Sequence, residues 1–203
     1  MEKVINLNCP GCGAPVSTKQ TTCGFCNRPI AITSITEIVS MSTLEVNKYA
    51  NAYRKELASN PDNQQLNLSL AMCYFKLKMY DNAAVPFAKA IEDNFDHSET
   101  FFYAAINLLR GKKAFVAPRA DIDKILEYLN AANMIESKSI YHYFLAYIKQ
   151  DYFDRKYLNI TPNWEKELKT ALERGLTKEE VNQMYELIGV EQPACLGIDD
   201  TRR

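Results

Sequence analysis

Glycine is scarce in this chain, and so are the residues and motifs on which most enzymes depend. Only seven of the 203 residues are glycine, and the chain has two histidines, His97 and His142. No segment has the pattern of a nucleotide-binding loop, a serine hydrolase or a zinc protease. We expect His97 to cap a helix and His142 to lie in a core or groove. The sequence therefore predicts a protein that is not an enzyme.

An excess of charge of one sign and a long apolar run are also missing. The chain has 24 lysines and arginines against 25 aspartates and glutamates, so its net charge is −1. A nearly neutral chain lacks the basic field that neutralises phosphates, which argues against binding to nucleic acid. No apolar run has the length of a membrane-spanning helix, so we expect no membrane span.

Four of the six cysteines form two identical pairs near the start of the chain. The pairs are Cys9–Cys12 and Cys23–Cys26, each with two residues between the cysteines. Two thiolates at this spacing reach one tetrahedral ion, and two such pairs complete the closed ligand set of a structural zinc site. The alternatives are two disulfides or a redox pair, and a redox pair needs a strand-to-helix setting that this segment lacks. We predict one structural Zn²⁺, bound by Cys9, Cys12, Cys23 and Cys26.

The stretch Cys9-Pro10-Gly11-Cys12-Gly13-Ala14-Pro15-Val16, followed by Cys23-Gly24-Phe25-Cys26-Asn27, resembles a zinc ribbon with rubredoxin-type knuckles. The resemblance covers residues 1–33. We expect short β structure there, at Val4–Asn8, in a hairpin between the knuckles and at Ile30–Thr33. Asn27 stands where the family often has glycine, but asparagine also tolerates a positive φ.

The cysteines also indicate in which cellular compartment the protein is expected. Thiolates that bind zinc, together with the further cysteines Cys73 and Cys195, are typical of a reducing environment. We expect no export signal, because Met1-Glu2-Lys3 leads directly into Val4-Ile5-Asn6-Leu7. The expected location is the cytoplasm.

From residue 43 onward, after a polar linker at 34–42, apolar residues recur with the period of a helix. The segment that starts at Gln64 resembles a tetratricopeptide repeat. The residues that match the signature of this repeat are Ala71, Tyr74, Tyr80, Ala83, Phe87 and Ala90. Small residues allow close helix approach, and the aromatic residues fill the wedge between the helices. Two residues depart from the repeat: Asn67 replaces a tryptophan, and Pro86 falls inside the second helix.

Weaker copies of this pattern extend the resemblance over residues 43–188. The predicted fold is mainly α, a short α-solenoid of tetratricopeptide-like helix pairs with a small N-terminal β zinc ribbon. The predicted domains are a zinc ribbon at 1–33, a linker at 34–42, the solenoid at 43–188 and an irregular tail at 189–203.

Solenoids of this kind use their first helices to line a groove that binds peptides or partner domains. We therefore predict a protein–protein interaction adaptor or scaffold that binds a protein or peptide with a hydrophobic or amphipathic segment. The alternatives are a zinc-ribbon factor associated with nucleic acid and a regulatory subunit of a larger enzyme complex. The predicted partner contacts are Leu68, Met72, Phe75, Phe102, Ile106 and Leu109 in the groove, with Lys112 and Lys113 beside it. The sequence leaves open whether the chain's own linker or tail fills the groove.

Overall fold

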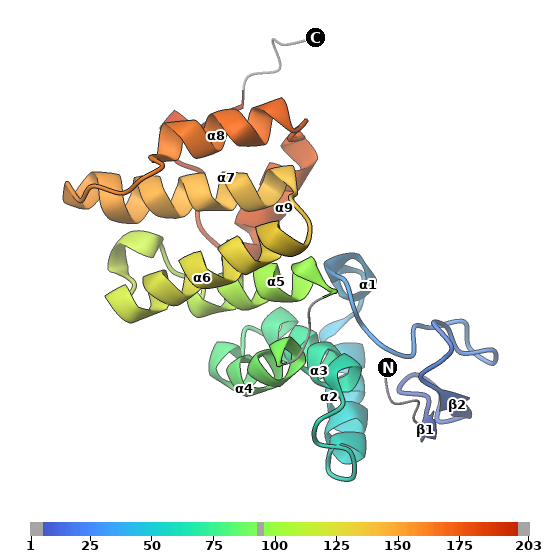
Figure 1. The fold of residues 1–203 in the computed structure, drawn as a ribbon. Coiled ribbons are helices and arrows are strands. Elements are labelled where there is room, and N and C mark those ends of the chain that lie inside the picture. Colours follow the sequence, from blue (N-terminus) through green and yellow to red (C-terminus); the bar gives the residue numbers. More distant parts are fainter. Residues whose placement is uncertain (1–5, 93–95, 199–203) are drawn as a thin grey trace. The chain divides into compact units, whose positions relative to one another are not determined.

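A computed structural model describes residues 6–92 and 96–198 of the chain. The contacts between backbone positions divide the chain into two compact units, Met1–Phe95 and Asp96–Arg203. In the described residues, α-helices pack in adjacent pairs within each unit, and the first unit also contains one small antiparallel sheet (Figure 1). This arrangement confirms the predicted mainly α class. None of the described helices is both long and apolar enough to cross a bilayer.

The first unit begins with the small sheet. Strand β1 (Asn6–Asn8) pairs with β2 (Pro15–Ser17) in antiparallel register, with Leu7 opposite Val16. Leu7 and Val16 are buried while their neighbours are more exposed, as the two-residue period of a strand requires. Val4 and Ile5, which we expected to begin the first strand, lie outside the described residues.

The strand predicted at Ile30–Thr33 does not form, and that prediction was wrong. Near it are an isolated antiparallel bridge between Thr22 and Pro29 and a hydrogen bond from the Ile30 N–H to the Thr21 carbonyl oxygen at 3.0 Å. Ile30 and Ile32 are fully buried, and their main-chain groups bond to side chains of the following helices. A buried backbone needs partners for its polar groups. Here helix side chains supply partners for the Ile32 N–H and the Ile30 carbonyl, so no continuous strand pairing is required.

Four helices complete the first unit: α1 (Ile35–Val39), α2 (Thr43–Leu57), α3 (Gln64–Lys76) and α4 (Tyr80–Ile91). Helix α3 packs against both α2 and α4. Ala71 on α3 and Ala83 on α4 are fully buried, in keeping with the small residues predicted at a helix crossing. Helix α4 continues through Pro86, which is itself buried.

Helices are the regular secondary structure of the described part of the second unit. Helix α5 (Ser98–Leu108) pairs with α6 (Arg119–Ile135), and α7 (Ser139–Ile148) pairs with α8 (Trp164–Glu173), while α9 (Lys178–Ile188) packs against α7. Short 3₁₀ turns cover η1 (Ala114–Val116), η3 (Asp154–Lys156) and η4 (Ala194–Leu196), and the turn η2 (Lys149–Phe153) is π-helical.

An aromatic cluster on α5, α7 and α9 forms the core of the second unit. The ring centroid of Phe102 lies 5.0 Å from that of Tyr141 and 5.8 Å from that of Phe144. The Tyr147 ring stacks on Phe144 at 6.1 Å and meets Tyr185 edge-on at 5.7 Å. Such ring pairs add stability beyond the area they bury, so this cluster fixes how the three helices meet.

The segment after α9 is packed against the second unit. Leu196 is fully buried, and its carbonyl oxygen accepts hydrogen bonds from the Tyr143 hydroxyl and the Gln192 side chain, each at 2.8 Å. The described part of the predicted irregular tail therefore includes an ordered turn that covers α7.

The boundary between the two units falls inside the segment 43–188 that we predicted to be one solenoid. The cysteine segment belongs to the same unit as α1–α4. The predicted linker contains α1, whose Ser34 and Glu37 form a capping box and whose Ile38 is fully buried. A segment with its own helix and a buried side chain is packed against its neighbours and is not a flexible tether.

Candidate metal centre

The first cysteine pair lies in a tight turn that follows strand β1. The main-chain N–H of Cys9 donates to the carbonyl oxygen of Ala14, and the N–H of Gly13 donates to that of Cys9, both at 2.8 Å. Gly13 closes the turn with a φ of 80°, a left-handed conformation that costs glycine nothing. This turn brings Cys12 back beside Cys9.

The second cysteine pair repeats this turn. The N–H of Cys23 donates to the carbonyl oxygen of Arg28, and the N–H of Asn27 donates to that of Cys23, again at 2.8 Å. Asn27 has a φ of 56° at the position equivalent to Gly13. Asparagine takes the place of glycine here, as predicted, because the left-handed turn forms with Asn27 in it.

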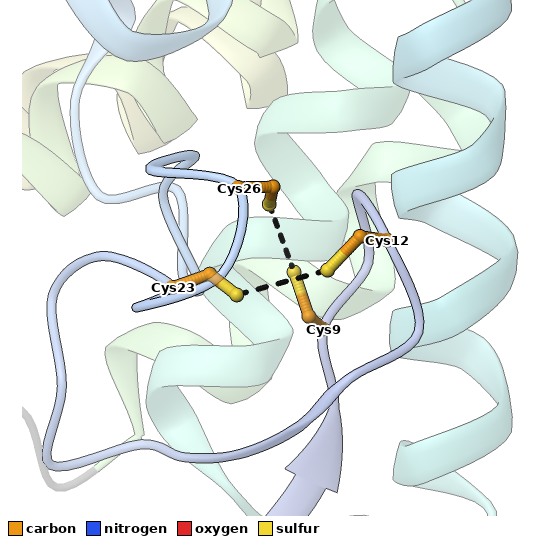
Figure 2. A group of neighbouring side chains, drawn as sticks. All are labelled: Cys9, Cys12, Cys23 and Cys26. Atoms are coloured by element: carbon orange, nitrogen blue, oxygen red, sulfur yellow. Dashed lines mark hydrogen bonds between the residues drawn. The ribbon is translucent and has the colours of Figure 1, made fainter.

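The two turns face each other and bring the four sulfurs together (Figure 2). The Sγ atoms of Cys9 and Cys26 lie 3.7 Å apart, as do those of Cys12 and Cys23, and all four sulfurs lie within 4.8 Å of one another. A disulfide needs a sulfur–sulfur distance of about 2.05 Å, so none is present among them. Sulfurs at the corners of a tetrahedron around zinc, with bonds of about 2.3 Å, would be about 3.8 Å apart. The geometry therefore fits one tetrahedral ion.

The environment of the cysteines affects how easily each loses its proton. Main-chain N–H groups of Phe25 and Cys26 point at the Cys23 sulfur and lower its pKa to about 7. Burial raises the pKa of the Cys9 thiol to about 12. A divalent cation would favour the deprotonated form of each thiol that binds it, so metal binding would release protons.

Tyrosines of α2 hold the second turn in place. The Tyr49 hydroxyl donates to the carbonyl oxygen of Pro29 at 3.1 Å, and the Tyr53 hydroxyl donates to that of Ile30 at 2.9 Å. Burial raises the pKa of both tyrosines, so their hydroxyls remain protonated and act as donors. The helix thereby satisfies carbonyl groups next to the cysteines.

Two further contacts join the cysteine turns to the helices. The N–H of Ile32 donates to the Ser69 hydroxyl on α3 at 2.9 Å, and Arg28 forms a surface ion pair with Glu45 on α2 at 2.7 Å. Gly11 lies so close to its neighbours that an added Cβ would be 3.3 Å from the Tyr49 hydroxyl and 3.0 Å from the Arg28 side chain. Glycine at this position lets the first turn approach α2 closely.

The structure does not bring the predicted partner-binding residues together at an open surface. Leu68, Met72, Phe75, Phe102, Ile106 and Leu109 are all buried. Phe75 packs its ring against Tyr80 and Phe87, as a core side chain does. Contact between a partner and these six side chains would require the helices around them to separate, so their role in binding stays a prediction. Lys112 and Lys113 are exposed.

The two histidines differ in their surroundings. His97 occupies the N-cap position of α5, as expected, but its side chain makes no capping hydrogen bond. His142 Nδ1 lies 2.9 Å from a carboxylate oxygen of Glu167, whose other oxygen accepts a hydrogen bond from Lys149 at 2.6 Å. This network joins α7 to α8, which agrees with a core role for His142.

Sequence reasoning missed the buried polar residues of the turn η2. Lys149, Gln150 and Asp151 are consecutive and all buried. Their polarity suggested an exposed end of a helix, and nothing in their order indicates the extra residue per turn that a π-helical turn contains. Only contacts with distant segments explain their burial.

Histidine, cysteine, aspartate and glutamate are the side chains that usually bind metal ions in proteins. Among the described residues, the four cysteines are the one group of such side chains close enough together to hold an ion. Comparisons with protein-family models, with curated proteins and with solved structures found no match to the chain. The inference of function therefore rests on the geometry of the chain itself.

Proposed function

We propose that this chain is a non-enzymatic protein–protein interaction adaptor whose N-terminal segment folds around one structural Zn²⁺. The observation that carries the zinc assignment is the cluster of four cysteine sulfurs, in which two pairs lie 3.7 Å apart and all four lie within 4.8 Å of one another. Protein ligands fill all four positions of such a site, which leaves no open position for a substrate or a reactive water. The metal would then hold the fold together and take no part in a reaction.

Two finer assignments belong to this proposal. The two matching cysteine turns support a zinc ribbon with rubredoxin-type knuckles at residues 1–33. The close α3–α4 pair, with fully buried alanines at positions 71, 83 and 90, supports a tetratricopeptide-like arrangement of the helices. Stacked helix pairs of this kind commonly present surfaces for partner proteins. The proposed location is the cytoplasm, where thiols remain reduced.

Metal analysis of the purified chain tests the zinc assignment. We expect one zinc per chain, because the four thiolates form one closed set. Tetrahedral thiolate sites also accept iron, so the same sample should be measured for iron and for its visible absorbance. A colourless protein with one equivalent of zinc supports the assignment. A coloured iron protein, or a chain purified under reducing conditions without metal, would contradict it.

The accessible part of the predicted partner surface is the loop between α5 and α6. Lys112 and Lys113 are exposed there, and Val116 is 63% exposed. An apolar side chain beside two cations suits a partner segment that is amphipathic and carries acidic groups. We therefore propose that this loop contacts the partner.

Reversing the charge of the loop should slow partner association. The Lys112→Glu and Lys113→Glu double variant should bind an affinity-isolated partner with an association rate lowered by about tenfold at low salt, because charges at the rim of an interface steer the encounter. The measurement is surface plasmon resonance at several salt concentrations.

The matched control is Lys166→Glu with Lys169→Glu, which makes the same change in net charge at exposed positions of α8. Equal slowing by both double variants would show a general charge effect and would contradict the loop assignment. A salt-dependent shift with DNA or RNA would instead favour the nucleic-acid alternative. Isolation of a stoichiometric catalytic partner would favour the regulatory-subunit alternative.

A further inference from the structure

A serine, a histidine and a glutamate form a hydrogen-bonded chain where α7 meets α8. Ser137 lies two residues before α7, His142 lies on α7 and Glu167 lies on α8. The Ser137 Oγ atom is 3.1 Å from His142 Nε2, and His142 Nδ1 is 2.9 Å from a carboxylate oxygen of Glu167. A hydroxyl, an imidazole and a carboxylate in this order are the arrangement by which proteins activate a serine as a nucleophile.

The hydrogen bonds determine which nitrogen of His142 can accept a proton. A carboxylate only accepts hydrogen bonds, so His142 Nδ1 carries the hydrogen that faces Glu167. In the neutral imidazole, Nε2 then has a lone pair toward the Ser137 hydroxyl. The hydroxyl also lies 3.5 Å from Asn133 Oδ1, but His142 is the nearer acceptor. His142 is therefore placed to take the hydroxyl proton.

Burial separates the two ends of this hydrogen-bonded chain. Glu167 is buried and also accepts a hydrogen bond from the buried Lys149 at 2.6 Å, so its carboxylate is held from two sides. The His142 side chain is 16% exposed, and Ser137 is exposed. An exposed hydroxyl can bond to water instead, so the fold does not require its contact with His142. The buried groups orient the base, while the nucleophile is open to a reactant in solution.

A cation lies beside the main chain of the nucleophile. The Arg174 Nη1 atom donates a hydrogen bond to the main-chain carbonyl oxygen of Ser137 at 3.3 Å. Negative charge develops on the carbonyl oxygen of an ester when a hydroxyl attacks it, and a nearby guanidinium stabilises that charge. A guanidinium has five N–H donors, so Arg174 keeps donors for a reactant after its bond to Ser137.

We propose that Ser137 is a covalent modification site that accepts an acyl group from an activated ester, with His142 as the base. The Ser137 Oγ atom forms a bond to the acyl carbon as its proton passes to His142 Nε2. The bond between the acyl carbon and the leaving oxygen breaks, and His142 gives the proton to that oxygen. The products are an O-acylserine and an alcohol or phenol. This site goes beyond the adaptor function and does not depend on it, because a single acyl transfer makes the chain a substrate and not an enzyme.

The test treats the full chain with p-nitrophenyl acetate and locates the acetylated positions by peptide mass spectrometry. We expect Ser137 to be acetylated about a hundredfold faster than Ser59, because a positioned base accelerates proton transfer by about 10²–10⁴. Ser59 is the matched control within the same sample. It is also exposed, but it forms no hydrogen bond with a described histidine.

The two histidines provide matched variants. His142→Gln should slow the acetylation of Ser137 by about a hundredfold, because an amide is a poor proton acceptor. His97→Gln should leave the rate unchanged, since His97 lies at the start of α5. Arg174→Met should slow the acetylation by about tenfold, because it removes the cation. Urea unfolding followed by Trp164 fluorescence checks that each variant is folded.

The proposal is overturned if Ser137 is acetylated no faster than Ser59 in the wild-type chain, or if a folded His142→Gln variant reacts at the wild-type rate. If His142→Gln does not fold, the comparison of the two serines and the Arg174→Met variant decide the question. Release of many equivalents of p-nitrophenol that depends on Ser137 would support the nucleophile and would contradict the proposal that the chain is not an enzyme.

Discussion

Replacing Cys12 with serine is expected to release the metal and unfold the cysteine segment of the first unit. A hydroxyl is a poor substitute for a thiolate, and three remaining ligands leave the tetrahedral set open. Binding of structural zinc contributes about 10–16 kcal/mol in small zinc domains, and that contribution to folding is lost with the ion. The zinc content should fall from one equivalent to well below half.

The structure indicates which helices should lose stability when the cysteine segment unfolds. Ile30 and Ile32 are fully buried and follow the second cysteine pair directly. Each side chain that leaves the core removes about 1.5–3 kcal/mol of hydrophobic stabilisation. Helices α2 and α3 should therefore loosen, because the hydrogen bonds from Tyr53 and to Ser69 are lost with the segment.

Hydrogen exchange and fluorescence can follow the two units separately. The amides of residues 6–33 should exchange rapidly in the Cys12→Ser variant, and those of α2 and α3 should lose part of their protection. Trp164 is the only tryptophan of the chain and lies on α8, so its fluorescence reports the second unit. The Trp164 unfolding midpoint should remain unchanged.

The control for this prediction is Cys195→Ser. Cys195 is an exposed free cysteine in the second unit, outside the four-sulfur cluster. This variant should keep its zinc and its exchange pattern. Full retention of metal by Cys12→Ser, or equal loss in both variants, would show that the cluster is not the metal site.

Replacing Glu167 with alanine should destabilise the second unit by about 3–5 kcal/mol. Glu167 is buried, and its carboxylate accepts hydrogen bonds from Lys149, itself 5% exposed, and contacts His142. Removal of one partner of a buried ion pair leaves the other charge without compensation, which costs far more than the pair itself contributes. Lys149 would then lie buried in the second unit without the carboxylate that pairs with it.

Urea unfolding monitored by Trp164 fluorescence measures this effect directly. Glu173→Ala is the matched control, because Glu173 lies on the same helix and forms only an exposed pair with Lys169 at 3.7 Å. We expect the control to change the stability by less than about 0.5 kcal/mol. A Glu167→Ala variant that unfolds at the wild-type midpoint would mean that the network does not support the α7–α8 pair.

Much of the candidate metal centre could be predicted from residue spacing. Two cysteines separated by two residues form a turn whose geometry is local, because the hydrogen bonds at Gly13 and Asn27 span only a few residues. Helix positions were likewise predictable from their period and their caps, such as Ser42 with Glu45 and Thr177 with Glu180. Interactions between residues that are only a few positions apart depend on the local sequence, so they can be predicted from it.

The surroundings of these elements could not be read in the same way. The apolar residues assigned to a groove, such as Met72 and Phe102, are buried, because periodicity shows which residues share a helix face but not what covers it. The segment Ile30–Thr33 has the composition of a strand, yet its backbone groups bond to Tyr53 and Ser69. Partners that lie far apart in the sequence decided both outcomes.

The sequence by itself determined the two cysteine pairs that can hold a metal ion, the mainly α class and the absence of recognisable catalytic motifs, since these depend on residue type and short spacing. The tertiary structure decided that Tyr49 and Tyr53 donate hydrogen bonds to the segment directly after the second cysteine turn, that Glu167 joins Lys149 to His142, and that Gln150 lines a cleft. Burial and long-range hydrogen bonds arise only when segments that are distant in the sequence come into contact, so they cannot be predicted from local sequence patterns.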